Sequence, residues 1–92
     1  MELITDASSD TESSAVVSTG PIIVSVTGTF TTGIVRITGD IGAGEATALV
    51  ITPATFKKLD VIGFPAGVTF KAYAEDIISS DSVTVAYINA IY

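Results

Sequence analysis

The sequence contains no cysteine, no histidine and no tryptophan. Without cysteine there is neither a disulfide framework nor a thiolate metal site to reinforce the fold. Without histidine the chain lacks the commonest general base and the commonest transition-metal ligand. These absences exclude zinc hydrolysis, Ser-His-Asp or Cys-His catalysis, and haem ligation by His or Cys. Catalysis by carboxylates, Tyr, Lys or Thr stays open on composition alone.

Charge is also scarce. Charged residues make up 15% of the 92 residues, against about 25% in an ordinary soluble domain. Apolar residues make up 48%. A domain of this size has a large surface relative to its core, so few charges are available to cover it. We expect a neutral surface rich in Ser, Thr and Gly, an apolar part buried in a long-lived assembly, or both.

The few charges are unevenly placed. Four of the ten acids (Glu2, Asp6, Asp10 and Glu12) fall in the first 12 residues, where there is no Lys or Arg. The remaining six acids and four bases leave the rest of the chain near −2 of the total −6. Four dispersed cations cannot neutralise a run of phosphates, so we expect no nucleic-acid partner.

The chain also lacks targeting signals. No run of about 18 apolar residues is present, so we expect no transmembrane helix and no membrane partner. The first residues carry acids where a signal peptide needs a basic start followed by an apolar run. We therefore expect that the chain is not exported.

Residues 1–18 read as an acidic N-terminal arm that precedes a β-domain over residues 19–92. A Ser-, Thr- and acid-rich segment is disordered unless it lies on something. It either docks as a short strand or lies across a neighbouring subunit, and we favour the second. The expected anchors in the arm are Leu3, Ile4, Val16 and Val17. On this interpretation, deleting residues 1–14 leaves the β-domain folded.

The rest of the chain alternates between apolar and polar residues with the period of a β-strand. Ile22, Val24 and Val26 share one face, and residues 31–33 read as a hairpin turn. The expected strands are residues 14–18, 22–30, 34–38, 46–52, 56–62, 68–74 and 82–91. No long amphipathic helix is predicted. The pattern predicts an all-β fold: a single small antiparallel β-sandwich or barrel, jelly-roll or immunoglobulin-like, of about six or seven strands.

The last expected strand is apolar on both faces near the C-terminus. Such a strand either lies at the end of the sandwich beneath a loop or packs against another subunit. The residues that we expect at a subunit contact are Ile88, Ile91 and Tyr92.

The sequence offers no convincing catalytic, metal or cofactor site. The glycine-rich segment 39–44 leads into a strand and lacks a phosphate-loop signature. The acids Glu75, Asp76 and Asp81 lack the spacing of a calcium loop. A chain this short leaves little room for two carboxylates to face each other across a glycosidase cleft. We therefore expect a protein that is not an enzyme and has no cofactor, with Tyr73 as a minor candidate for carbohydrate contact.

Three segments resemble small phage virion proteins. Residues 26–30 followed by 33–40 are similar to their opening hairpin, residues 64–72 to a later strand, and residues 80–85 to their closing strand. The resemblance implies a β-sandwich without catalytic residues. It also implies that the protein binds the major capsid protein or another virion protein as a homo-oligomer, with a trimer favoured.

We therefore expect a non-enzymatic structural protein of a bacteriophage virion that is assembled in the host cytoplasm. Its expected role is to bind and stabilise the capsid as a decoration or cement protein. The alternative is a tail- or head-associated adhesion or ligand-binding β-sandwich module. Exposed aromatic residues converging at one end of the sandwich would favour that alternative, and the sequence offers Tyr73 and little else.

Overall fold

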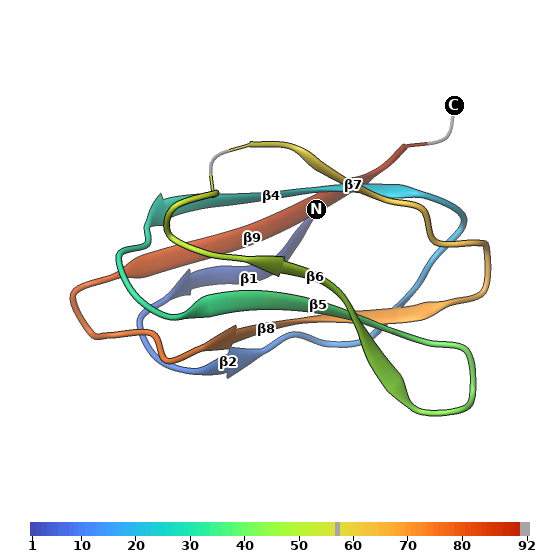
Figure 1. Cartoon of the computed structure of the whole chain (residues 1–92), viewed down its shortest axis with the longest axis horizontal. Coiled ribbons are helices and arrows are strands. Elements are labelled where there is room, and N and C mark those ends of the chain that lie inside the picture. Colours follow the sequence, from blue (N-terminus) through green and yellow to red (C-terminus); the bar gives the residue numbers. More distant parts are fainter. Residues whose placement is uncertain (57, 91–92) are drawn as a thin grey trace.

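The computed structural model describes residues 1–56 and 58–90, and this part of the chain is all-β. Two antiparallel sheets of four and five strands pack against each other as a small β-sandwich, which confirms the predicted fold class (Figure 1). The strands are β1 (Glu2–Ala7), β2 (Thr11–Glu12), β3 (Val16–Val17), β4 (Ile22–Thr29), β5 (Ile34–Asp40), β6 (Glu45–Ile51), β7 (Asp60–Ile62), β8 (Thr69–Glu75) and β9 (Ser82–Asn89). Within the described residues, no helix has the length and apolar character needed to cross a membrane.

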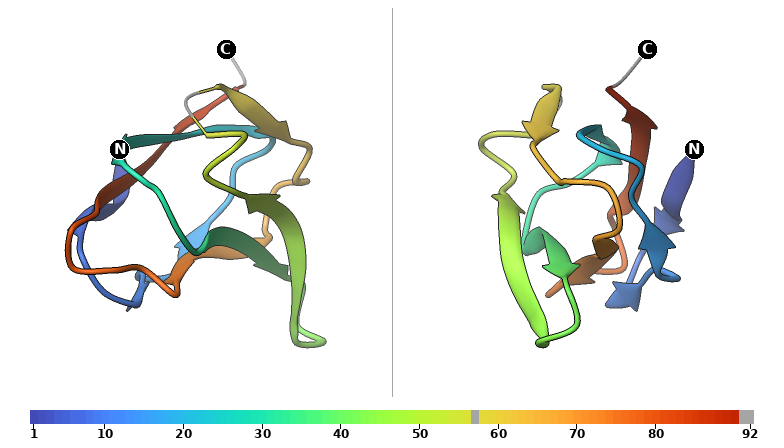
Figure 2. Two further views of the ribbon diagram at one scale, coloured as in Figure 1. Left: turned by 60° about the vertical axis from the view of Figure 1, so that its left-hand side comes forward. Right: turned by 90° about the vertical axis from the view of Figure 1, so that its right-hand side faces the viewer.

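The strands are divided between two layers, which separate clearly in the side views (Figure 2). The first sheet has the order β1-β9-β4-β7, and the second has β2-β8-β5-β6 with β3 also paired to β8. The longest pairing joins β4 to β9, from Ile22 opposite Asn89 to Thr29 opposite Ser82. Strand β7 forms one edge of the first sheet, and β6 forms one edge of the second.

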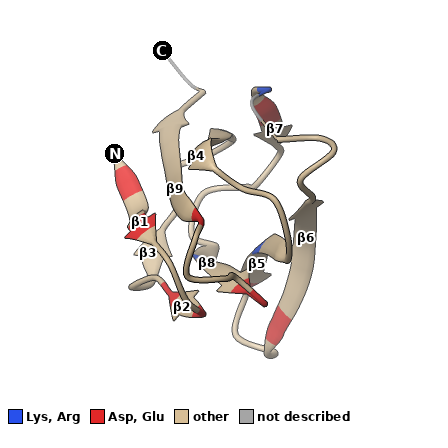
Figure 3. Ribbon diagram, turned by 90° about the vertical axis from the view of Figure 1, so that its left-hand side faces the viewer, with Lys and Arg blue, Asp and Glu red and all other residues tan. Residues whose placement is uncertain are grey.

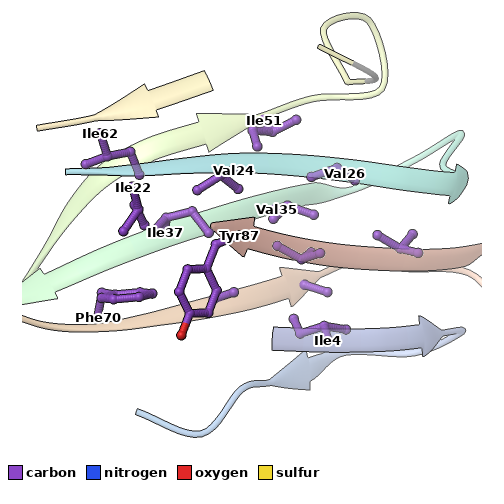
Figure 4. Packing of buried hydrophobic residues seen from close by; sticks show 14 of the residues in the cluster. Ile4, Ile22, Val24, Val26, Val35, Ile37, Ile51, Ile62, Phe70 and Tyr87 are labelled. Carbon is purple, nitrogen blue, oxygen red and sulfur yellow. The ribbon is translucent and has the colours of Figure 1, made fainter. Parts of the chain in front are cut away.

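The core lies between the sheets, on the faces that the alternation predicted. Ile22, Val24 and Val26 are fully buried on β4, as are Val83 and Val85 on β9. Each such side chain contributes roughly 1.5–3 kcal/mol on burial. Aromatic rings join the layers: the ring of Phe70 meets that of Tyr87 edge to face, with centroids 5.1 Å apart (Figure 4).

The structure corrects the expectation of a separate N-terminal arm. Strand β1 pairs with β9, with Ile4 opposite Val85, and β2 and β3 both pair with β8. Ile4 is only 2% exposed and belongs to the core. Residues 1–18 are therefore part of the sandwich, and the division between residues 18 and 19 marks no boundary in the fold.

Two serines tie this segment down. The Ser13 hydroxyl accepts a hydrogen bond of 2.8 Å from the backbone N–H of Ala72. The Ser18 hydroxyl accepts one of 3.1 Å from the N–H of Val68 and donates one of 2.7 Å to the carbonyl of Pro65. These bonds satisfy backbone groups of β8 and of the segment that leads into it, which the two-residue strands β2 and β3 do not reach.

Two further expectations differ from the structure. The turn at residues 31–33 was predicted to close a hairpin, but β4 and β5 lie in different sheets, so the turn crosses between layers. The strand expected over residues 56–62 is confined to β7. Before it, the Thr52 carbonyl accepts hydrogen bonds from the N–H groups of Thr55 and Phe56, which closes a turn instead of extending a ladder.

A buried carboxylate holds the crossing turn in place. Asp81, 3% exposed on the loop between β8 and β9, accepts hydrogen bonds from the backbone N–H (2.9 Å) and hydroxyl (2.8 Å) of Thr31. The N–H of Thr32 donates a third bond of 3.4 Å. The backbone bond from Thr31 is the main reason that the pKa of Asp81 lies below its ordinary value of 3.8, although desolvation opposes the shift.

Asp81→Asn is expected to lower the urea midpoint of unfolding at neutral pH, because the amide is a weaker acceptor for the Thr31 N–H and hydroxyl. The folded pKa is depressed, so the stabilisation is present above the unfolded value of 3.8 and is lost as the pH falls through the folded pKa. The difference in urea midpoint between the wild type and Asp81→Asn should therefore shrink as the pH falls below 3.8. Ser80→Ala, at the exposed neighbouring position, is the control. Equal midpoints for wild type and Asp81→Asn at neutral pH would contradict the role given to this carboxylate.

Candidate partner-binding surfaces

The outer face of the second sheet is polar, and its charges are paired with each other. The Nε of Arg36 donates to the Glu75 carboxylate at 3.0 Å, and the guanidinium lies 4.7 Å from the centre of the Tyr73 ring. The Tyr73 hydroxyl in turn donates to the Glu45 carboxylate at 2.8 Å. These contacts link strands β8, β5 and β6 across the face.

The pKa values on this face reflect the same pairing. The ion pair with Glu12 raises the pKa of Lys71, and the hydrogen bond to Glu45 raises the pKa of Tyr73. Both shifts follow because the partner stabilises the protonated form. This face is therefore already occupied by its own contacts. The Tyr73 hydroxyl and ring are both engaged, which weakens its candidacy for carbohydrate contact.

The outer face of the first sheet is apolar at one end. Ile23 on β4 lies directly opposite Ile88 of β9 on one side and Val61 of β7 on the other. Ile88 and Val61 are 60% and 67% exposed. The row continues into neighbouring side chains around a shallow hollow of about 150 Å³. We call this surface the apolar face; it consists of Met1, Ile23, Leu59, Val61, Ala86 and Ile88.

The apolar face gives way to hydroxyl groups along the same two strands. The outward residues of β4 run from Ile23 through Ser25 to Thr27, and those of β9 run from Ile88 through Ala86 to Thr84. Neither strand contains a charged residue, whereas acidic residues mark the flanking strands β1 and β7 and, in the second sheet, β2 and β6 (Figure 3). A contiguous and exposed apolar patch is typical of a surface that another protein covers.

The predicted contact residues fall in different places. Ile88 is exposed on the apolar face, and Val17 is exposed on β3. Leu3 and Val16 are half-buried against the core. The choice of Ile4 as a partner anchor is corrected, because its side chain is buried in the core between the sheets and cannot reach a partner. Ile91 and Tyr92 lie outside the described residues.

Sequence reasoning missed several members of the apolar face. Ile23 was not singled out, although it follows Ile22 directly and the two must point to opposite sides of the sheet. Val61 beside Ile62 repeats the same signal. Such apolar doublets in strands mark places where both sides of a sheet are apolar.

The acids that were weighed as a calcium or glycosidase site are not brought together. Glu75 is turned toward Arg36, and Asp81 toward the turn at Thr31. Across residues 1–56 and 58–90 the structure has no cluster of three His, Cys, Asp or Glu side chains that could hold a metal ion.

A larger groove of about 510 Å³ lies beside β6 and is predominantly apolar. Gly39, Ala46, Phe64 and Val68 contribute to its lining, and Glu45 is the one ionisable residue among the described residues that line it. A single carboxylate already bonded to Tyr73 cannot act as an acid–base pair. The lining of the groove is suited to an apolar side chain.

No protein-family model, curated protein or solved structure matches this chain. The likeness to phage virion proteins therefore depends on the three sequence segments alone. The first spans the crossing from β4 to β5, the second leads into β8, and the third opens β9. All three contribute to the two central strand pairings of the sandwich.

Proposed function

We propose that the protein is a non-enzymatic structural protein of a bacteriophage virion, which binds the assembled capsid and stabilises it as a decoration or cement protein. The observation that carries this proposal is the exposed apolar row formed by Ile88, Ile23 and Val61, two of which lie on the uncharged strands β9 and β4. The resemblance of three segments to small virion proteins supplies the class of partner.

The chemistry of the apolar face constrains that partner. Burial of an aliphatic side chain contributes roughly 1.5–3 kcal/mol, whereas an unpaired charge buried against it is strongly unfavourable. The partner surface is therefore apolar and uncharged where it meets Ile88 and Val61. The major capsid protein, or another virion protein that presents such a patch after assembly, fits this requirement.

Stabilisation would follow from mass action. A protein that binds the assembled shell and not the free subunits stabilises the shell by an amount that rises with its concentration relative to its Kd. No catalytic group is needed for this work. The paired charges on the opposite sheet would keep the outer surface of the bound protein hydrated, because Arg36 and Lys71 each already hold a carboxylate.

The proposal is tested by cosedimentation with assembled capsids of the phage that encodes the chain. Ile88→Lys and Val61→Lys are each expected to raise the Kd for the capsid at least about tenfold, because burying one charge costs more than the roughly 1.4 kcal/mol that a factor of ten in Kd represents. Thr27→Lys, on the hydroxyl half of the same sheet, is the matched control and should bind like wild type.

All three positions are exposed or at the surface, so the variants are expected to keep the wild-type circular dichroism spectrum. Wild-type occupancy for Ile88→Lys and Val61→Lys would show that the apolar face is not the docking surface. Failure of the wild-type protein itself to sediment with capsids would reject the proposed function.

A further inference from the structure

Strand β6 is the least protected of the described sheet edges. It is seven residues long, carries a single charge at Glu45, has one bulge, and lies at the end of the second sheet. An edge strand presents a row of unpaired N–H and C=O groups, and proteins usually protect it with charge, bulges or short length. The other described edges are better protected: β1 has two register breaks and two acids, β7 has three residues, and β2 and β3 have two each.

A bulge at Ala48 determines which side chains of β6 point outward. The register passes from Ile37 opposite Leu49 to Thr38 opposite Thr47, so Ala48 is an extra residue. As a result, Glu45, Thr47 and Val50 all share the outer face with Arg36, while Ala46 and Leu49 share the inner one.

We propose that β6 pairs antiparallel with β6 of a second copy, around a two-fold axis at the bulge, so that the two second sheets become one continuous sheet. Centring the pair on the bulge keeps the faces matched: Glu45 lies opposite Val50 of the second copy, and Ala46 lies opposite Leu49. The bulges of both copies meet at the centre. On either side of them, outward side chains of one copy lie opposite outward side chains of the other, and inward ones opposite inward ones.

Charge favours the antiparallel arrangement with a second copy. Parallel pairing would set the two Glu45 side chains side by side, whereas antiparallel pairing places them at opposite ends. Each Glu45 then lies beside Val50 of the other copy, and Val50 is itself opposite Arg36. With strands about 4.8 Å apart, the backbones of Glu45 and that Arg36 are roughly 10 Å apart. At that distance the opposite charges attract each other weakly, and Arg36 keeps its contact with Glu75 while Glu45 keeps its bond from Tyr73.

The groove beside β6 supports the same register. Ala46 lines it together with Phe64 and Val68. Leu49 of the second copy, opposite Ala46 and on the inner face, would lie at the mouth of this apolar groove. A partner strand for β6 must be long and nearly uncharged, and among the described edges β6 itself meets that requirement.

This inference goes beyond the proposed function and uses a different surface. It predicts a two-fold pair in place of the trimer that the resemblance implies. The apolar face lies on the outer side of the first sheet, whereas the pairing uses the edge of the second sheet, so the two surfaces use different residues.

The test exploits the absence of cysteine from the chain. Ala48→Cys places one thiol beside the proposed axis, where Cα atoms of the two copies fall within the roughly 4.4–6.8 Å that a disulfide bridges. Under mild oxidation this variant should form a disulfide-linked dimer at least about tenfold faster than Ser80→Cys, an exposed loop position used as the control. Equal rates for the two variants would overturn the pairing.

The native mass, measured by light scattering, provides a second test of the pairing. The wild-type protein should have twice the chain mass of 9.4 kDa. Ala46 is exposed, and Ala46→Lys places a charge between the two paired β6 strands. This variant should be a monomer, whereas Ile88→Lys should remain a dimer. A wild-type monomer, a trimer, or a dimer that is lost with Ile88→Lys but kept with Ala46→Lys would reject the proposal.

Discussion

Ile4→Ala is expected to lower the free energy of unfolding by about 2–5 kcal/mol. The side chain is 2% exposed and lies in the core cluster, with its backbone opposite Val85 of β9. Truncation leaves a cavity between the sheets in addition to the lost burial. The loss is large against a total stability of about 5–15 kcal/mol for a small domain. Equilibrium unfolding in urea, followed by circular dichroism, measures it.

Thr5→Ala is the control for this experiment, because Thr5 is the next residue of β1 and is exposed. It should change stability by less than about 0.5 kcal/mol. If Ile4→Ala matched Thr5→Ala, then β1 would add nothing to the core and the N-terminal segment would be an arm after all. The same reasoning reverses the expectation for deletion of residues 1–14, which should destabilise the whole sandwich because it removes both β1 and β2.

Gly28→Ala is expected to destabilise the protein by about 2–6 kcal/mol. Gly28 has a φ of +97°, a conformation that is strained for any other residue by about 1–3 kcal/mol. A methyl group there would also overlap the backbone carbonyl oxygen of Ser82, where β9 pairs with β4. Relieving that overlap requires the central strands to move apart, at a further cost of about 1–3 kcal/mol.

Gly67→Ala separates the two contributions. Its φ of +94° is nearly the same, but nothing lies within 4 Å of the position that its methyl group would take. In Gly67→Ala only the strain of the backbone conformation should reduce the free energy of unfolding. This variant should therefore be more stable than Gly28→Ala in the same urea experiment. Equal losses for the two variants would show that the approach of β9 to Gly28 is not what requires glycine.

The central strands were predictable because their information is local. In β4, β8 and β9 every second residue is apolar, and those residues face the core in the structure. Alternation of this kind specifies both strand type and the inward face. The β-sandwich follows from several such strands without a helix between them.

The N-terminal strands were not predictable by the same means. Strands β2 and β3 have two residues each, too few for a pattern. Their pairing depends on β8, more than fifty residues away, whose edge they cover. The division of β4 and β5 between sheets has a similar origin, because it depends on Asp81, fifty residues beyond Thr31, holding the turn.

The candidate surface was only partly predictable for a related reason. Ile88 was identified from its own strand, but the row that it forms with Ile23 and Val61 exists only through cross-strand register. A single sequence does not give that register. It does show the apolar doublets that make such a row possible.

The two outer faces of the sandwich differ in chemistry. On the second sheet, cations such as Arg36 and Lys71 hold carboxylates, whereas on the first sheet the exposed row around Ile88 has no polar partner to offer. On the first sheet the acids lie on the edge strands β1 and β7, and the central strands β4 and β9 have none. Under the proposed function, the charged second sheet stays hydrated while the apolar row on the first sheet meets the partner.

The thermal stability of the capsid itself is the most direct test of the central claim, that this protein stabilises an assembled shell. Shells are heated with and without the wild-type protein, and their disassembly is followed by light scattering. The disassembly temperature is expected to rise with the concentration of the wild-type protein, and Ile88→Lys is expected to shift this rise to higher concentrations. An unchanged disassembly temperature at saturating wild-type protein would contradict the claim.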